Sequence, residues 1–426
     1  MSANFDALPF RPADILLPQN CDLSLWAVVA CDQYTSQPEY WQRVEERVGR
    51  APSALRLILP ESSLDGPQVE TDIMDINNTM TRWLREDRFA LLPGSMVYVE
   101  RTLDNGRVRR GLVGMVDLAQ YDYDMGSDSR IRATEGTVLS RIPPRVAVRK
   151  NAPIELPHTM LLCDDPRMTV IQPLASAKSE MEPLYDFQLM EEGGRVAGWR
   201  LGAAQLEQVA AALTALADPA AFRARHGEDS GSVMLFAVGD GNHSLATAKE
   251  CYERQKRLTD PSRWDTLPAR YALCELVNLH DPSLEFAPIH RVVFNTDPQR
   301  LLDDLLSRHP GSHLGSGDGH TLEFIYENGT GKLTLPRSAA RLPVGALQNF
   351  LDDWLAQNPG RVDYIHGADV ARSFGKRRGN ITFLLPPMDK GELFPSVIHD
   401  GVLPRKTFSM GEANHKRFYL EARKIR

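Results

Sequence analysis

The sequence lacks long hydrophobic runs, paired cysteines and a basic leader segment. No apolar run approaches the roughly 20 residues that a membrane-spanning helix requires. The N-terminus has no basic segment followed by an apolar one. The five cysteines are scattered, odd in number and include no Cys-x-x-Cys pair, a pattern typical of reduced proteins. We therefore expect a cytoplasmic protein that is neither exported nor bound to a membrane.

The sequence also lacks an excess of basic residues. Its 49 Lys and Arg residues face 56 Asp and Glu residues, which gives a formal net charge of -7. A nucleic-acid groove needs concentrated Lys and Arg to displace counterions from phosphates. The short basic run Lys376–Arg378 is typical of a solvated surface, and no helix-turn-helix pattern is evident. We expect no nucleic acid among the partners.

What the sequence does have is an ordinary globular composition in which strand and helix patterns alternate. Its 426 residues, 42% of them hydrophobic, suffice for a large core and two or more domains. Asn105-Gly106 and Asn328-Gly329 each favour a hairpin turn, which introduces antiparallel pairing. The patterns predict an α/β protein with mixed sheets (α+β). The expected helices are 71–86, 201–216, 244–257, 347–357 and one that starts near Pro38, and the expected strands are 26–30, 55–59, 96–100, 112–118, 158–163, 233–238, 271–279, 322–326 and 362–366.

The strongest local signal is a strand–turn–helix unit at residues 232–257. The apolar run Val233–Val238 meets the turn Gly239–His243 (Gly-Asp-Gly-Asn-His), and a segment with helical apolar spacing, Ser244–Arg257, follows. Glycines permit positive φ and close backbone approach to a ligand, and N–H groups at a helix start favour an anion. The turn is therefore either a phosphate- or carboxylate-binding loop or a tight connection with a hydrogen-bonded Asp and His. The polar side chains crowded at the end of a buried strand favour binding.

Two other polar segments also have two interpretations each. Glu135 lies among Arg130, Arg132 and Arg141, an arrangement that suits an anionic substrate, although spacing alone favours a solvated loop. Residues 32–37 could form the lip of a pocket, but the default for such a cluster before a helix is a cap.

Three further segments carry motifs that could have a functional role. His280 and His290 lack the close ligand spacing of a zinc site, which favours a structural or substrate-positioning role. Arg405–Thr407 places two cations before a hydroxyl, a group that could bind phosphate or carboxylate through charge-assisted hydrogen bonds. The glycine-rich segment 315–320 leads into a strand and not a helix, so it does not fit a dinucleotide-binding fingerprint.

Taken together, these motifs resemble a known family. Over nearly its whole length the chain is similar to the bacterial and archaeal domain-of-unknown-function family ten-fifteen (DUF1015). The segments that carry the resemblance are Ala30–Trp41, Thr134-Glu135, Gly239–His243, Pro288–Arg291 and Leu403–Thr407.

That family is similar, more distantly, to the free serine kinases, which make O-phosphoserine from free serine and a nucleotide. The resemblance implies a ParB/sulfiredoxin-like nucleotide-binding core over residues 121–426, preceded by an additional α/β domain over residues 1–120. It also implies Mg²⁺ and a nucleotide, ATP or ADP, as cofactors and a small molecule as the substrate.

The resemblance also implies site residues, position by position. The glutamate that serves as base in the kinases corresponds to Glu135. The loop that holds phosphate and metal corresponds to Gly239–Ser244, where Asp240 would hold the metal and take part in catalysis with His243. The residues with implied substrate- or phosphate-binding roles are Gly239, Gly241, Asn242, Ser244, His290, Arg291, Arg405, Lys406 and Thr407.

Three positions depart from the kinase pattern. Thr134 stands where the kinases have His, Asn242 replaces the first loop His, and Ser244 replaces the loop Arg. Serine cannot supply the bidentate, charge-assisted bonds of arginine, so another cation must substitute for it. A sulfiredoxin activity is disfavoured, because its reactive cysteine position is Asn242 and the nearest thiol, Cys251, lies about two turns into the helix.

We therefore expect a Mg²⁺-dependent phosphotransferase that moves a nucleotide phosphoryl group to the hydroxyl of a small metabolite, with free serine as the implied acceptor. The alternative is a non-catalytic nucleotide-binding regulator or switch protein that uses the same loop. Nucleotide consumption that depends on an added acceptor would separate the two.

Overall fold

The computed structural model describes residues 4–426, which form two compact units. The first unit comprises Met1–Leu284 and Glu412–Arg426, and the second comprises Glu285–Gly411. No helix in the described part of the chain is long and apolar enough to cross a membrane.

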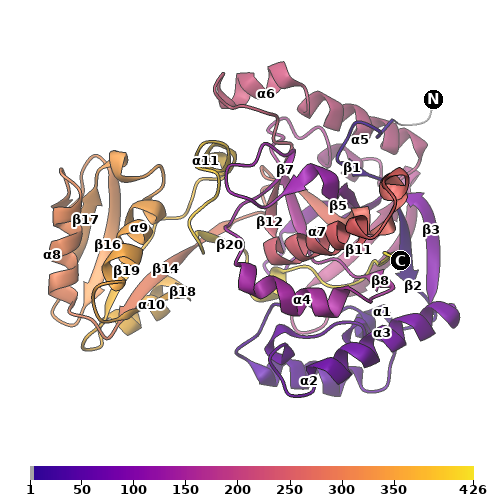
Figure 1. Ribbon diagram of the computed structural model, residues 1–426, viewed down its shortest axis with the longest axis horizontal. Coiled ribbons are helices and arrows are strands. Elements are labelled where there is room, and N and C mark those ends of the chain that lie inside the picture. The colour runs from indigo at the N-terminus through magenta and orange to yellow at the C-terminus, as the bar shows by residue number, and fades with distance from the viewer. Residues whose placement is uncertain (1–3) are drawn as a thin grey trace. The chain divides into compact units, whose positions relative to one another are not determined.

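The first unit is built on a mixed, ten-stranded sheet (Figure 1). In order across the sheet, its strands are β10 (Glu182–Gln188), β11 (Arg195–Arg200), β4 (Val97–Thr102), β5 (Val108–Asp117), β13 (Tyr271–Asn278), β9 (Met160–Cys163), β12 (Phe236–Asp240), β7 (Ile131–Ala133) and β6 (Tyr121–Asp122), with β1 (Phe10–Arg11) paired to β5. β12 runs parallel to β7 and antiparallel to β9. The carboxyl ends of β7 and β12 therefore meet at the same edge of the sheet.

Helices and two small sheets complete the first unit. The two-stranded sheets pair β2 (Ala13–Pro18) with β3 (Phe89–Ser95), and β8 (Ile154–Glu155) with β21 (Arg423–Lys424). The helices are α1 (Leu23–Trp26), α2 (Pro38–Val48), α3 (Val69–Arg85), α4 (Ile142–Arg149), α5 (Ala203–Leu216), α6 (Pro219–His226) and α7 (Asn242–Arg257). Figure 1 shows α2 and α3 on one side of the large sheet and α5 and α6 on the other.

Both faces of the large sheet are buried. Val97 and Val99 of β4 enter a core cluster with side chains of α2 and α3, whereas Tyr98 between them enters a cluster with side chains of α5 and α7. Leu273 and its neighbour Ala272 on β13 divide in the same way. Successive side chains of a strand point to opposite faces, so this alternation places one apolar layer on each face of the sheet.

The helix that starts near Pro38 is confirmed. Pro38 occupies the first position of α2, where its missing N–H costs no hydrogen bond. Trp41, Val44 and Val48 are buried along one face of the helix. The capping interpretation of residues 32–37 is wrong, because the N-cap residue Gln37 makes no side-chain cap bond to any described residue.

Two of the expected strands are wrong. Trp26 ends the short helix α1, and residues 27–30 are buried with only an isolated bridge from Val29 to Phe418. Ala54–Arg56 forms a 3-10 turn where a strand at 55–59 was expected. Both segments are apolar because they are buried, and burial alone does not impose extended pairing.

The expected hairpins and the central unit are confirmed. Asn105-Gly106 lies in the turn between the antiparallel strands β4 and β5. β12 begins at Phe236, three residues later than the apolar run, and α7 begins at Asn242 directly after the turn.

The second unit has an antiparallel sheet of its own. Its strand order is β15 (His313–Leu314), β17 (Gly329–Leu335), β16 (His320–Tyr326), β19 (Ile381–Leu384), β14 (Phe286–Phe294) and β18 (Arg361–His366), with β20 (Phe408–Met410) paired to β14. The expected hairpin between β16 and β17 is confirmed, with its turn one residue earlier: Glu327-Asn328 connects the strands, and Gly329 begins β17 opposite Tyr326. Its helices are α8 (Pro298–Arg308), α9 (Pro343–Leu355), α10 (Ala368–Gly375) and α11 (Leu393–Asp400).

The mixed α/β class is confirmed by these sheets and helices. β4 and β5 pair in one sheet with strands that follow residue 121, so the expected boundary near residue 120 falls inside the first compact unit. The ParB/sulfiredoxin-like assignment of the core stays a prediction.

Candidate functional site

The site begins at the turn between β12 and α7. Asp240 ends the strand, Gly241 adopts a left-handed conformation with φ of 79°, and Asn242 opens the helix. A Cβ atom on Gly241 would lie 2.8 Å from the Thr159 hydroxyl oxygen. Glycine is therefore required here both by backbone conformation and by the close approach of Thr159.

The start of α7 is open to an anion. Its N-cap residue is Gly241, which has no side chain with which to cap the first N–H groups. The Gly241 N–H donates to its neighbour's Oδ1, the carboxylate of Asp240, at 3.0 Å. The partial positive charge at the N-terminus of this 16-residue helix also favours an anion.

The structure brings the segment of Glu135 to this turn. The Thr134 N–H donates to Asn242 Oδ1 at 3.2 Å, and the Thr134 hydroxyl donates to the Val238 carbonyl at 2.6 Å. Further along, the Val138 N–H donates to His243 Nε2 at 3.3 Å. Two bonds before Glu135 and one after it therefore fix this segment to the loop. Thr134 therefore serves as a structural connector.

A lysine from the C-terminal segment supplies the cation that the loop itself lacks. Lys416 Nζ lies 3.3 Å from Asp240 Oδ2, and the lysine side chain is only 9% exposed. Its position follows from backbone bonds that join the neighbouring segment to residues near the N-terminus: the Ala30 N–H donates to the Arg417 carbonyl, and the Tyr419 N–H donates to the Val28 carbonyl.

The charge of the same lysine also lowers the pKa of a second carboxylate, Asp32. Burial raises the pKa of Asp32, but the charges of His158 and Lys416, with a hydrogen bond from Gln33, outweigh burial and hold it below its usual value. Lys416 thus pairs with Asp240, and its charge also acts on Asp32.

Ser244, in the first turn of α7, belongs to a hydrogen-bonded chain. Its hydroxyl lies 2.8 Å from His158 Nε2, and His158 Nδ1 lies 2.8 Å from the Tyr419 hydroxyl. The Cys31 N–H donates to the same tyrosine oxygen at 3.1 Å. His158 is buried and held at both ring nitrogens, so its orientation is fixed.

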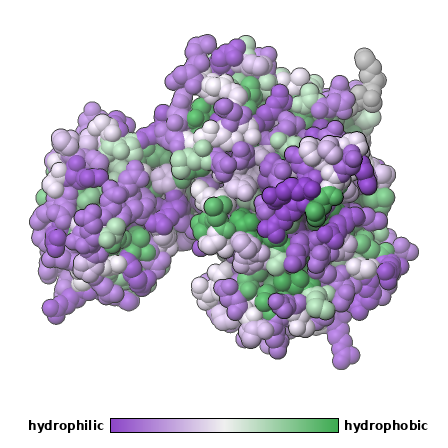
Figure 2. Space-filling model, in the orientation of Figure 1, coloured by the Kyte–Doolittle hydropathy of each residue, from purple (hydrophilic) through white to green (hydrophobic). Residues whose placement is uncertain are grey.

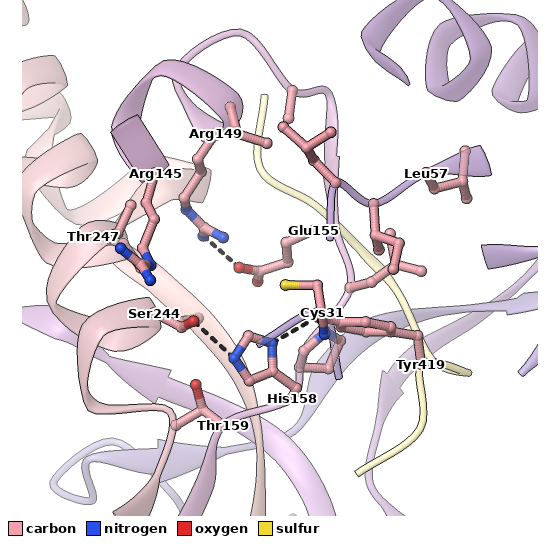
Figure 3. Close-up of a pocket in the computed structure, with 18 of the residues that line it drawn as sticks. Cys31, Leu57, Arg145, Arg149, Glu155, His158, Thr159, Ser244, Thr247 and Tyr419 are labelled. Carbon is pink, nitrogen blue, oxygen red and sulfur yellow. Dashed lines mark hydrogen bonds and ion pairs between the residues drawn. The ribbon is translucent and has the colours of Figure 1, made fainter. Parts of the chain in front are cut away.

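This chain lies at one side of a cavity of about 160 Å³ (Figure 3). The side chains of Arg145, Arg149, His158 and Ser244 project toward the same space in the close-up. Most of the lining is apolar and comes from α3, α4, α7, β13 and the segments at residues 57–64 and 152–159, the second of which includes β8. The apolar members are Leu57, Ile58, Leu59, Leu64, Met80, Val148, Ala152, Ile154, Leu156, Leu245, Ala248, Ala272 and Leu273.

The charges at the cavity are paired. Arg145 Nε donates to Glu61 at 2.9 Å, and Arg149 pairs with Glu155. Burial raises the pKa of Glu155, but Arg149 and Arg423 outweigh it and hold the pKa below its usual value. The thiol of Cys31 also lines the cavity, and burial raises its pKa to about 12, which keeps it protonated.

The remaining candidate residues lie in the second unit. Arg291 is fully buried and its guanidinium donates to the carbonyls of Ile289, Arg405 and Lys406 and to Gln348. It therefore fixes the backbone of the segment 405–407. Lys406 has φ of 55° and an exposed side chain.

The side chains around Lys406 are engaged within this unit. Arg405 pairs with Asp352, and the Thr407 hydroxyl donates to the Pro404 carbonyl. His290 Nδ1 accepts from the Leu385 N–H at 3.1 Å, and burial together with neighbouring positive charges lowers the pKa of His290 to about 4. His290 is therefore neutral at physiological pH, which fits its hydrogen-bonded position.

Metal ligands are sparse among residues 4–426. No group of three or more His, Cys, Asp or Glu side chains in this range could hold a metal ion. Asp240 offers a carboxylate beside the helix start. A single carboxylate suits Mg²⁺ that arrives with nucleotide phosphates and water, because Mg²⁺ commonly uses one or two protein carboxylates in such sites.

Sequence reasoning missed His158, Lys416 and Tyr419, which come from distant parts of the chain. The only local signal was the polar cluster at residues 32–37, which includes Asp32 and could form the lip of a pocket. The half-buried Asp32 feels the charges of His158 and Lys416, and its neighbour Cys31 lies in the cavity wall, which favours that interpretation.

The comparisons with known proteins place the chain in a family. The model of the family described as "Protein of unknown function (DUF1015)" matches residues 8–352, so the chain belongs to this family. No curated protein matches the sequence.

Solved structures give remote similarities. A free serine kinase mutant in complex with AMP aligns with a TM-score of 0.37 at 10% identity, over 73% of this chain and 90% of its own. A conserved hypothetical protein from Pyrococcus furiosus has a TM-score of 0.34 at 10% identity, over 72% and 90%. SbnI with a C-terminal truncation, from Staphylococcus aureus, has a TM-score of 0.37 at 9% identity, over 70% and 82%. Similarity at this level carries no conclusion about activity.

Proposed function

We propose that this protein is a Mg²⁺-dependent phosphotransferase that moves a phosphoryl group from a nucleotide, ATP or ADP, to the hydroxyl of a small metabolite. One observation carries the proposal. The glycine-led start of α7 is flanked by the Asp240–Lys416 ion pair and hydrogen-bonded to the segment of Glu135. Under this proposal the helix start would bind phosphate, Asp240 would bind the metal, Lys416 would supply a cation and Glu135 would act as the base, all near the end of one strand.

The helix start and Lys416 supply the positive charge that phosphates need. N–H groups of the first turn can donate to phosphate oxygens, and the helix dipole favours negative charge there. Lys416 takes the role of the missing loop arginine. Its ammonium group is a point charge, whereas an arginine guanidinium is a planar group that can donate two parallel hydrogen bonds. Lys416 would therefore hold phosphate by charge more than by bidentate geometry.

Asp240 would contribute one ligand to Mg²⁺ that is bound to the nucleotide. Each carboxylate oxygen can accept more than one interaction, so the bonds to Gly241 and Lys416 leave room for a ligand. When bound, Mg²⁺ neutralises charge on the phosphates.

Glu135 would orient the acceptor hydroxyl and take its proton. Its backbone is fixed on both sides by the bonds to Asn242, Val238 and His243. A base on a fixed segment meets the positional demand of general base catalysis.

A matched pair of variants tests the assignment of Glu135. Glu135→Gln retains size and hydrogen bonding but cannot accept the proton, so phosphoryl transfer should fall by roughly 100-fold or more while nucleotide affinity is unchanged. Glu135→Asp should retain part of the activity. Unchanged turnover in Glu135→Gln would remove Glu135 from the mechanism.

One observation favours the alternative, a nucleotide-binding regulator. Ser244 is engaged with His158, and Lys416 with Asp240, so both polar groups that flank the helix start are already paired within the protein. A regulator would bind nucleotide at this turn without transfer. The two functions differ in one measurement, because only the enzyme consumes nucleotide faster when an acceptor is supplied.

A further inference from the structure

The cavity beside the start of α7 has the size of a small apolar molecule. It measures about 160 Å³ and its lining is mostly aliphatic. An engineered apolar cavity of about 150 Å³ stays dry and binds benzene. An apolar group of about six carbon atoms therefore matches the volume and the apolar lining of the cavity in this protein. In the space-filling view, hydrophobic side chains reach the surface between α4 and the pair α2 and α3 (Figure 2).

The charged groups of the cavity neutralise one another. Arg145 is paired with Glu61, and Arg149 is paired with Glu155, so two cations meet two carboxylates. A ligand with a free carboxylate or ammonium would have to break one of these pairs to find its own partner. Burial of an unpaired charge is costly, so the cavity selects against zwitterions and favours an uncharged ligand.

The polar edge of the cavity offers hydrogen bonds to a hydroxyl. Ser244 has one donor and two acceptor positions, and its contact with His158 at 2.8 Å occupies only one of them. Thr159, which also lines the cavity, touches the turn at Gly241. A hydroxyl at this edge would lie next to the turn to which the proposed function assigns the phosphates.

We propose that this cavity binds an uncharged small alcohol with an apolar body of about six carbon atoms, its hydroxyl hydrogen-bonded to Ser244. We further infer that such an alcohol, and not free serine, is the phosphoryl acceptor, an inference that rests on the proposed function. The aliphatic lining holds the body, and Ser244 of the Ser244–His158 pair binds the hydroxyl.

Binding of three probes to the full chain tests the cavity directly. Benzyl alcohol carries the body and the hydroxyl, toluene carries only the body, and L-serine carries the hydroxyl with two charges. Isothermal titration should show benzyl alcohol binding roughly ten-fold or more tightly than L-serine, and more tightly than toluene. Equal or tighter binding of L-serine would overturn the proposal.

Two variants locate the binding. Ala248→Leu fills the cavity from α7 and should abolish benzyl alcohol binding, whereas the control Ala212→Leu, on buried α5 away from the cavity, should retain it. Ser244→Ala should remove the preference for benzyl alcohol over toluene. This variant tests the site even if Ala248→Leu does not fold. Benzyl alcohol binding that survives Ala248→Leu in the folded protein, or a preference that survives Ser244→Ala, would overturn the assignment.

Phosphoryl transfer then separates this inference from the proposed function. Phosphorylation of benzyl alcohol in preference to L-serine supports both. Phosphorylation of L-serine alone overturns the acceptor inference and leaves the phosphotransferase intact. Benzyl alcohol binding without transfer to any hydroxyl compound supports the cavity as a binding site and refutes the acceptor role together with the proposed function.

Discussion

Replacement of Gly241 by alanine tests the geometry of the turn on which the site depends. Alanine at φ of 79° is in the left-handed region, which costs roughly 1–2 kcal/mol for a residue with a Cβ. The new Cβ would also lie 2.8 Å from the Thr159 hydroxyl and 3.0 Å from its Cα, and relief of such overlap costs about 1–3 kcal/mol. Gly241→Ala should therefore lower the free energy of unfolding by about 2–5 kcal/mol.

A second glycine isolates the two contributions. Gly126 has φ of 76°, and no described atom lies within 4 Å of the position of its Cβ. Gly126→Ala should cost only the conformational part, about 1–2 kcal/mol. Urea denaturation of both variants, with the slopes compared to the wild type, gives the two losses. Equal losses would refute the claim that Thr159 packs against the turn.

Three further substitutions probe the ion pair, the connector and the second unit. Lys416→Met should weaken nucleotide binding by roughly ten-fold and lower stability by about 1–3 kcal/mol, because Asp240 loses its charged partner; Lys416→Arg should retain most of both, as titration calorimetry and denaturation can show. Thr134→Val leaves the buried Val238 carbonyl without its 2.6 Å bond, so denaturation should show a loss of about 1–3 kcal/mol, whereas a neutral result would contradict the connector role. His290 has a pKa lowered from 6.5 to about 4 in the folded protein. As the pH falls, His290 is therefore protonated in the unfolded chain before it is protonated in the folded protein. The stability contributed by neutral His290 is full above pH 6.5 and is lost as pH falls toward about 4. His290→Asn should therefore flatten the slope of stability against pH in this window, and an unchanged slope would contradict the assignment.

Local patterns predicted those elements whose signals lie within a short stretch of chain. The turn residues Asn105-Gly106 predicted the β4–β5 hairpin because that turn type needs residues that tolerate positive φ. The period of apolar residues predicted α3 and α7 for the same local reason. The glycine-rich turn after β12 predicted the helix start that anchors the candidate site.

What local patterns could not predict is set by contacts between distant segments. The apolar residues 26–30 were expected to form a strand, but they are buried against the C-terminal segment around Phe418, and that burial satisfies them without a strand. Lys416 and Tyr419 reach the site only because this segment is hydrogen-bonded to residues 28–30. No periodicity near either residue signals that role. The pairing of Ser244 with His158 depends on the same long-range packing.

The rate of nucleotide consumption with and without an added hydroxyl acceptor tests phosphoryl transfer by this protein directly. Purified full-length protein is incubated with Mg²⁺ and either ATP or ADP, alone or with a panel that includes benzyl alcohol and L-serine, and phosphorus NMR follows the products. We expect nucleotide consumption that requires an acceptor, yields a phosphorylated acceptor, and is lost in Glu135→Gln while nucleotide still binds. Nucleotide that binds but is never consumed with any acceptor would contradict the phosphotransferase and leave the regulator.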